Sequence, residues 1–225
     1  VIPFITFMNT VTGVDPPDIE LILTGFGKND PVNLKGLLAL FNYQDYIVDE
    51  FIKINENAFT FFMLPTLITP QSRGRVLLQS PDPEVDPIII PDYFSDPRDI
   101  QTFLRAYDII SRFVQTDPMK SIDATLHEIR IPACETYNFP SSEYRACALR
   151  YLAASAYHYA GTCKMGPSQD PTTVVGPDLK IHGIQGMRIV DASVMSTIVR
   201  GNTNAAVIMI AEKGSDLVKS TWIRQ

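Results

Sequence analysis

Few side chains in this sequence could transfer a proton near neutral pH, because its 225 residues include three histidines. His158 lies in the segment AYHYAGTCKMG, between Tyr157 and Tyr159 and just before the small residues Ala160 and Gly161. An imidazole with an ordinary pKa of about 6.5 suits the task of a general base. A histidine in a turn of small residues can equally be structural. The segment alone leaves both interpretations open.

A second group of polar residues lies 44 residues further on, where Asn202, Thr203 and Asn204 occupy positions typical of a helix N-cap. The free N–H groups and partial positive charge of a helix N-terminus attract an anionic or electron-rich ligand. The first residues of the expected helix, 205–210, are apolar on all sides, which predicts that this helix end is buried. These residues alone fit an ordinary cap as well as a site.

The elements that must position these residues follow from the apolar patterns and the turn residues between them. The first 95 residues predict mainly strands of an antiparallel sheet, interrupted by a helix near residues 34–53. Asp96 as N-cap and Pro97 at the first helical position start the clearest helix. A helix over 141–154, a short buried strand over 187–191 and a closing helix over 204–219 follow. The predicted strands cover 1–9, 19–26, 58–68, 74–80 and 86–94.

The bulk composition is that of a globular protein, with 45% apolar and 20% charged residues. A net charge of −6 without a basic stripe argues against a nucleic-acid partner. No apolar run reaches the roughly 20 residues of a membrane span, so no membrane partner is expected. The three cysteines lack a metal-ligand spacing, and no metal is expected.

Two of the cysteines, Cys134 and Cys147, flank a short loop that a disulfide could close. Loop entropy gives such a bridge about 3 kcal/mol, and its presence would imply an oxidising compartment. Two reduced core cysteines fit the spacing equally well.

Taken together, the segments resemble one family. YHYAGTCKMGP, DLKIHGIQGMRIVDASVMSTIVRGNTNAA and IMIAEKGSDLV resemble the C-terminal signature of the glucose-methanol-choline (GMC) oxidoreductases, which are FAD-dependent alcohol oxidases and dehydrogenases. The insect, glucose dehydrogenase-like branch is the most similar. SRGRVLLQSPDP and IIIPDYFSDPRDIQTFLRAYDI resemble the same family's substrate domain, so nearly the whole chain can be aligned with its C-terminal half.

The resemblance implies an α/β fold in two parts. Residues 1–154 would form an α+β portion of the substrate-binding domain, with an antiparallel sheet and helices. Residues 155–225 would form the C-terminal part of an FAD-binding, Rossmann-like domain that carries the catalytic residues. The family's G-x-G-x-x-G turn for the FAD pyrophosphate does not occur in the sequence. The fold is therefore expected to be incomplete without an N-terminal portion of the same polypeptide, present as a separate chain.

By the same resemblance, His158 is the catalytic base and Asn202 the second active-site residue, which orients the substrate. The expected contacts with FAD come from Tyr157, Asp191, Ala192, Asn202 and Thr203. The remaining histidines, His182 and His127, are expected to be structural, and Cys163 is expected to be a buried thiol. Because insect members often carry cysteines at these positions, the resemblance also favours a Cys134–Cys147 disulfide and a secreted, extracellular protein.

The implied reaction oxidises an alcohol CH–OH group by hydride transfer to flavin N5, with His158 taking the hydroxyl proton. The alternative on the same scaffold is an FAD-containing hydroxynitrile lyase, which cleaves a cyanohydrin without net redox change. A third hypothesis is a degenerate member that serves in binding or storage. The small-molecule partner is thus an alcohol or a cyanohydrin. Tyr159-Ala160 replaces the Pro-Val that insect relatives commonly have after the histidine, which leaves the substrate open.

Overall fold

The computed structural model describes residues 4–13 and 16–223. The chain divides into two compact units, Val1–Ser72 with Tyr93–Ala156, and Arg73–Asp92 with Tyr157–Gln225. The predicted division at residue 155 lies close to the change of unit between Ala156 and Tyr157. Residues 73–92, however, belong to the same unit as the later residues. The chain contains both helices and strands, which agrees with the predicted mixed α/β class.

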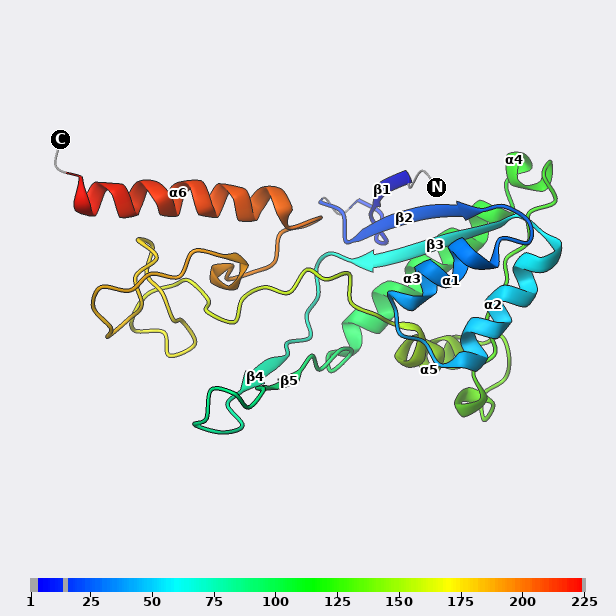
Figure 1. Ribbon diagram of the computed structural model, residues 1–225. Helices are drawn as coiled ribbons and strands as arrows, with labels where there is room; N and C mark the ends of the chain where they lie inside the picture. The colour runs from blue at the N-terminus through cyan, green and yellow to red at the C-terminus, as the bar shows by residue number, and fades with distance from the viewer. Residues whose placement is uncertain (1–3, 14–15, 224–225) are drawn as a thin grey trace. The chain divides into compact units, whose positions relative to one another are not determined.

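The first unit is built on a three-stranded antiparallel sheet in the order β1-β2-β3 (Figure 1). β1 covers Phe4–Met8, β2 covers Ile19–Phe26 and β3 covers Thr60–Leu67. Ile19 pairs with Met8 on one side and Leu67 on the other, and its side chain is fully buried. The antiparallel sheet is confirmed, with β2 at its predicted bounds; residues 1–3 of the first predicted strand lie outside the described residues.

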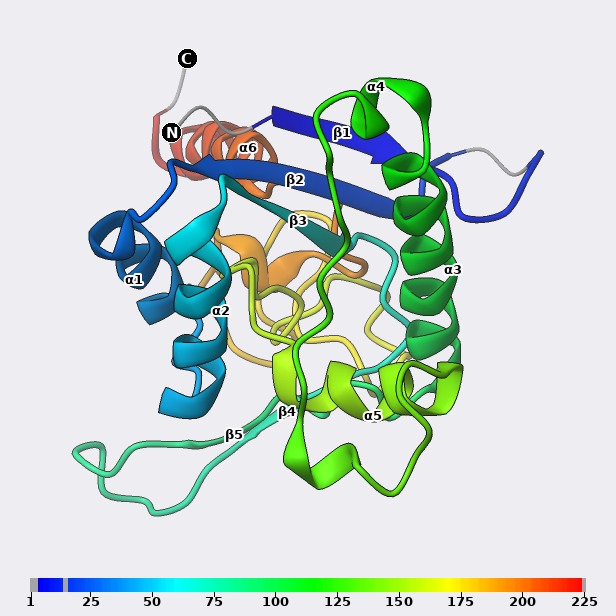
Figure 2. The same ribbon diagram turned by 90° about the vertical axis from the view of Figure 1, so that its right-hand side faces the viewer.

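The single helix predicted over 34–53 is wrong, because two helices occupy this region. α1 spans Pro31–Ala39 and α2 spans Asp45–Asn57. Between them Asn42 adopts a left-handed backbone with φ of 51°, and Gln44 is extended, so the helical hydrogen-bond pattern cannot continue. Both helices pack beside the end of the strands that carries Phe26 and Phe62 (Figure 2).

The long helix predicted from Asp96 is confirmed as α3, Pro97–Val114. The Asp96 carboxylate accepts a hydrogen bond from the Arg98 backbone N–H at 2.9 Å, which is the expected N-cap. The next helix, α4, is a single turn over Asp117–Lys120. α3 lies towards the opposite end of the strands from α1 and α2, where its Asp99 carboxylate accepts from the Gln71 backbone at 2.8 Å (Figure 2).

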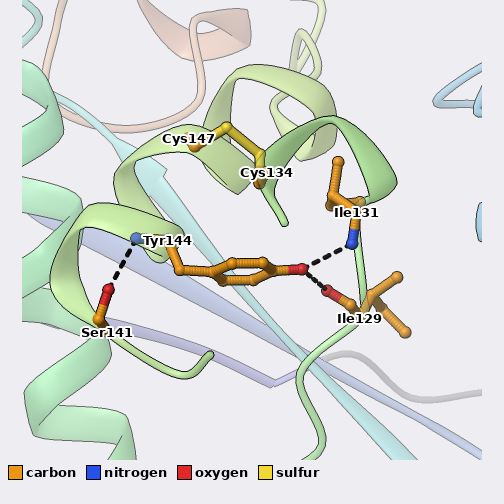
Figure 3. Close-up of a disulfide and its surroundings, with 6 residues drawn as sticks. All are labelled: Ile129, Ile131, Cys134, Ser141, Tyr144 and Cys147. Carbon is orange, nitrogen blue, oxygen red and sulfur yellow. Dashed lines mark hydrogen bonds between the residues drawn. A yellow bond between two sulfur atoms is a disulfide. The ribbon is translucent and has the colours of Figure 1, made fainter. Parts of the chain in front are cut away.

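A disulfide between Cys134 and Cys147 ties the short helix η1, Pro132–Cys134, to α5, Ser142–Leu152. The pairing favoured by the resemblance is therefore confirmed. Beside it the buried Tyr144 hydroxyl donates to the Ile129 carbonyl and accepts from the Ile131 N–H, at 3.2 and 2.6 Å (Figure 3). The bridge and the phenol together hold the irregular 129–134 segment against α5.

The second unit contains a short antiparallel pair, β4 (Arg75–Leu77) with β5 (Ile88–Ile90), and a mostly irregular segment that packs on one long helix, α6, Asn204–Trp222. The core between the irregular segment and α6 is formed by Val175, Leu179, Val194, Met195 and Ile210. Figure 1 shows α6 lying along this segment.

The strand predicted over 187–191 is wrong. Its one ladder contact is an isolated bridge between Lys180 and Arg188. The Ile189 N–H donates to the Leu179 carbonyl within a turn-rich stretch, so this apolar segment is satisfied by loop hydrogen bonds and by packing on α6. The predicted burial is also wrong, because Met187 and Asp191 are exposed and residues 188–190 are only half-buried.

The prediction that the start of α6 is buried is also wrong for this chain. Ile208 and Met209 are 55% and 60% exposed, whereas Thr203 and Ile210 are buried. The irregular segment covers only one side of the helix, so Ile208 and Met209 on the other side remain largely exposed. Among the described residues, no helix combines the length and apolar character needed to cross a membrane.

Candidate active site

The segment around His158 is held to residues 192–194 by three backbone hydrogen bonds. The N–H groups of Gly161, Cys163 and Met165 donate to the carbonyls of residues 192, 193 and 194, at 3.3, 2.9 and 3.0 Å. Gly161 has φ of 85°, and a Cβ there would lie 3.1 Å from the Met195 carbonyl oxygen. Glycine is favoured here, because a side chain would be strained in the left-handed backbone and would crowd this carbonyl. The small residues after His158 therefore serve to anchor the histidine segment.

This anchoring brings His158 to the N-terminus of α6. Its Nε2 lies 2.8 Å from Asn202 Oδ1, and its Nδ1 lies 2.9 Å from Thr203 Oγ1. The histidine is half-buried, Asn202 is exposed, and Thr203 is 8% exposed. One ring nitrogen therefore faces a solvent-accessible amide and the other a buried hydroxyl. The two predicted catalytic residues, 44 positions apart in the chain, are in direct contact.

Thr203 is the N-cap residue of α6, yet its side chain forms no capping hydrogen bond to that helix. A threonine at this position usually accepts from a backbone N–H two or three residues further on. Here the hydroxyl is bonded to the imidazole. The sequence analysis assigned Thr203 to the cofactor and missed its contact with His158. The N-cap pattern predicted instead that the Thr203 side chain would bond to a backbone N–H of its own helix.

Three other predicted cofactor residues lie near the histidine segment in the chain or in its hydrogen-bond pattern. The Asp191 carboxylate accepts from the Ser193 N–H at 2.7 Å and so caps the short helix η2, Ala192–Val194. Ala192 supplies the carbonyl that binds the Gly161 N–H. Tyr157 is exposed and has a left-handed φ of 61°. Their roles toward FAD remain predictions.

The remaining histidines and the free cysteine lie elsewhere. His182 Nε2 is 3.1 Å from the Gly166 carbonyl within a turn, and the exposed His127 contacts Thr125. Cys163 is half-buried, which corrects the expectation of a buried thiol. The described residues contain no group of three or more acidic, histidine or cysteine side chains that could hold a metal ion.

Comparison with known families identifies the family of the chain. A family model described as GMC oxidoreductase matches residues 70–211, which is more than half of the chain and includes His158, Asn202 and Thr203. The chain belongs to the GMC oxidoreductase family, as the resemblance predicted.

Relatives with curated names include insect oxidoreductases. The chain is 39% identical over 175 residues to a glucose dehydrogenase [FAD, quinone] of Drosophila pseudoobscura pseudoobscura, covering 78% of this chain and 28% of that protein. It is 38% identical over 206 residues to an ecdysone oxidase of Bombyx mori, covering 92% of this chain and 29% of the relative. The chain thus spans less than a third of the length of these relatives.

Solved structures show the same fold. A fungal aryl-alcohol oxidase superposes with a TM-score of 0.60 at 31% identity, over 72% of this chain and 26% of the other. A pyridoxine 4-oxidase of Mesorbium loti superposes with a TM-score of 0.67 over 94% of this chain and 36% of the other; at 22% identity it supports the fold alone. The predicted fold class is confirmed, and FAD, the predicted cofactor, is the cofactor of this family.

Proposed function

We propose that the complete protein oxidises the CH–OH group of an alcohol with FAD as the hydride acceptor, and that His158 is the general base. The observation that carries the proposal is the contact of His158 with Asn202, across 44 residues and at 2.8 Å, inside the region matched by the family model. The insect and fungal relatives with alcohol or sugar substrates in their names support the same reaction class.

The reaction divides an alcohol into a hydride, a proton and a carbonyl. When bound, FAD accepts the hydride that leaves the carbon. His158 takes the hydroxyl proton, so that the O–H bonding electrons form the carbonyl π bond as the C–H bond breaks. Asn202 cannot titrate, and its exposed amide beside the imidazole can hold the substrate oxygen by a hydrogen bond. The two side chains thus supply proton transfer and orientation.

The residues around the start of α6 suit an electron-rich flavin edge. Because the Thr203 side chain does not cap α6, the first N–H groups of that helix receive no side-chain acceptor from their own N-cap residue. These groups and the helix dipole favour a ligand atom with negative charge. The backbone of Thr203, together with Tyr157, Asp191, Ala192 and Asn202, would hold FAD.

An N-terminal portion of the same polypeptide, as a separate chain or joined to this one, would complete the FAD site and cover the exposed apolar side of α6. Three observations support this partner: the chain spans 28% of its glucose dehydrogenase relative, it contains no G-x-G-x-x-G turn, and Ile208 and Met209 are exposed. The disulfide supports an oxidising, extracellular location. The mass of the intact native protein would show whether one chain or two are present.

Anaerobic addition of alcohols to the complete protein tests the proposal. We expect an alcohol to bleach the visible flavin absorbance, and His158→Ala to slow bleaching by about 10²-fold or more while FAD stays bound. His127→Ala is the matched control, because this histidine is exposed and far along the chain from the site. Cyanide release without bleaching would instead establish the hydroxynitrile lyase, and a colourless purified protein would favour binding or storage.

A further inference from the structure

The residue directly before His158 has a backbone conformation that is unfavourable for its side chain. Tyr157 is left-handed, with φ of 61°. A bulky residue rarely adopts this conformation, because its Cβ then lies too close to the following carbonyl oxygen. Such a conformation persists only where the surrounding structure holds it, and residues of this kind cluster at active sites. The contacts that hold Tyr157 therefore indicate what its conformation serves.

The other left-handed residues of the described chain, glycines apart, have an evident reason for this conformation. Four of them are asparagine or aspartate, whose short polar side chains tolerate it. Phe94 and Leu179 are bulky, but their side chains are buried, at 9% and 3% exposure, so packing in the core holds them. Tyr157 is 62% exposed. Packing of its own side chain in a core therefore cannot hold its backbone.

The residue that follows Tyr157 supplies the constraint. The imidazole of His158 is hydrogen-bonded to Asn202 and Thr203, at 2.8 and 2.9 Å. The next backbone hydrogen bond along the chain is donated by Gly161, and the three residues before it form no backbone–backbone hydrogen bond with any described residue. The direction in which the ring leaves the chain is thus set by its own two contacts and by the turn at Tyr157.

We infer that Tyr157 is a positioning residue whose left-handed backbone directs the ring of His158 to the start of α6. The two features support each other, because the ring contacts hold the unfavourable backbone and that backbone presents the ring to its partners. Rotation about φ of Tyr157 to the usual negative range would redirect His158 relative to the residues before it. The ring would then lose its contacts with Asn202 and Thr203.

The test compares Tyr157→Asn, which tolerates the left-handed backbone, with Tyr157→Ile, whose β-branched side chain disfavours it strongly. Both variants lose the phenol, so the difference between them reports the backbone. Flavin reduction by an alcohol is measured anaerobically in the complete protein, after FAD content has been checked. We expect Tyr157→Ile to be about 10²-fold slower than Tyr157→Asn, the factor that a misplacement of about 1 Å can cost. Tyr137→Asn and Tyr137→Ile are the matched control pair and should react equally fast, because Tyr137 is exposed but not left-handed.

A second measurement does not depend on turnover. Crystal structures of the two variants of the complete protein show the backbone at position 157 and the contacts of His158 directly. We expect Tyr157→Asn to keep a positive φ and both ring contacts, and Tyr157→Ile to have a negative φ and to lose at least one contact. Tyr157→Ala replaces Tyr157→Ile if the latter does not fold, because alanine tolerates the left-handed backbone less well than asparagine, and it should be slower than Tyr157→Asn.

The inference rests on the proposed function, but its failure is distinguishable. Equal rates in Tyr157→Asn and Tyr157→Ile would overturn the inference while leaving alcohol oxidation intact, because the backbone would then not be responsible. A structure of Tyr157→Ile that keeps both ring contacts of His158 would also overturn it. A wild-type protein that no alcohol reduces would refute the proposed function, and the structures would still decide the role of Tyr157.

Discussion

Removing the disulfide should loosen one well-defined part of the first unit. The bridge joins Cys134 and Cys147, which are 13 residues apart in sequence, and the Cys134 side chain is fully buried beside Tyr144 (Figure 3). For a loop of this length the chain-entropy model gives about 3 kcal/mol. Because about 1.4 kcal/mol changes an equilibrium constant tenfold, opening of this region should become on the order of 10²-fold more frequent.

The perturbation is the double variant Cys134→Ala with Cys147→Ala in the complete protein. Hydrogen exchange measured by mass spectrometry suits it, because peptides from 129–152 report opening of this region even when the whole protein does not unfold in one step. We expect protection to fall by about 10²-fold in these peptides and to change little in α6. Cys163→Ala is the matched control, since it removes the free cysteine and keeps the bridge.

Unchanged protection of 129–152 in the double variant would refute the reasoning, because the loop constraint would then contribute nothing. An equal loss in Cys163→Ala would also refute it, since the effect would come from removing any cysteine rather than from opening the loop.

Three further substitutions probe packing and a buried phenol. Gly214→Ala in α6 should lower the melting temperature, because the added Cβ would lie 2.3 Å from Val190 Cγ1 and overpacking costs about 1–3 kcal/mol. Gly36→Ala in α1 is the control and should raise the melting temperature slightly, because an added Cβ there meets open space and alanine favours a helix. Burial raises the pKa of Tyr43 to about 12, and its hydroxyl donates to the Leu152 carbonyl. Because the folded pKa exceeds the unfolded value of about 10, this contribution to stability is complete below pH 10 and lost as pH rises through 12. Denaturant unfolding across this range should show a smaller alkaline loss in Tyr43→Phe, and an identical loss would contradict the assignment.

Local sequence signals predicted those elements whose ends are marked by the chain itself. The 19–26 strand and the helix after Asp96 have clear periodicity and clear boundaries, and both form as expected. The prediction of one helix over 34–53 is wrong because a single left-handed residue, Asn42, divides the region into two helices. An asparagine adopts this conformation only occasionally, so the apolar pattern around it did not predict the break. The 187–191 strand failed because a strand needs a partner, and the apolar pattern contains no information about one.

The site was predictable only in part for a similar reason. Local residue types leave His158 as a histidine in a turn, and its pairing with Asn202 was expected from the family resemblance alone. The structure then adds what neither source contained: the hydroxyl of Thr203 bonds the ring instead of capping its helix. Thr203 has a helical backbone, with φ of −78° and ψ of −12°, whereas a capping residue has an extended backbone, so its hydroxyl is available for a partner 45 residues away.

The anchoring of His158 also bears on the proposed function, because the hydrogen bonds that hold the ring do not involve the side chain of the residue that follows it. The three backbone hydrogen bonds that hold the segment begin at Gly161, and the side chains that hold the ring come from Asn202 and Thr203. Tyr159 lies in the chain between His158 and the first of those bonds, at Gly161, and is exposed. A change at this position replaces a side chain beside the base without removing any of the hydrogen bonds that fix it. If the complete protein has the proposed alcohol-oxidising activity, substitution of Tyr159 should change which alcohol reduces the flavin fastest, while the hydrogen bonds that hold the His158 segment stay in place.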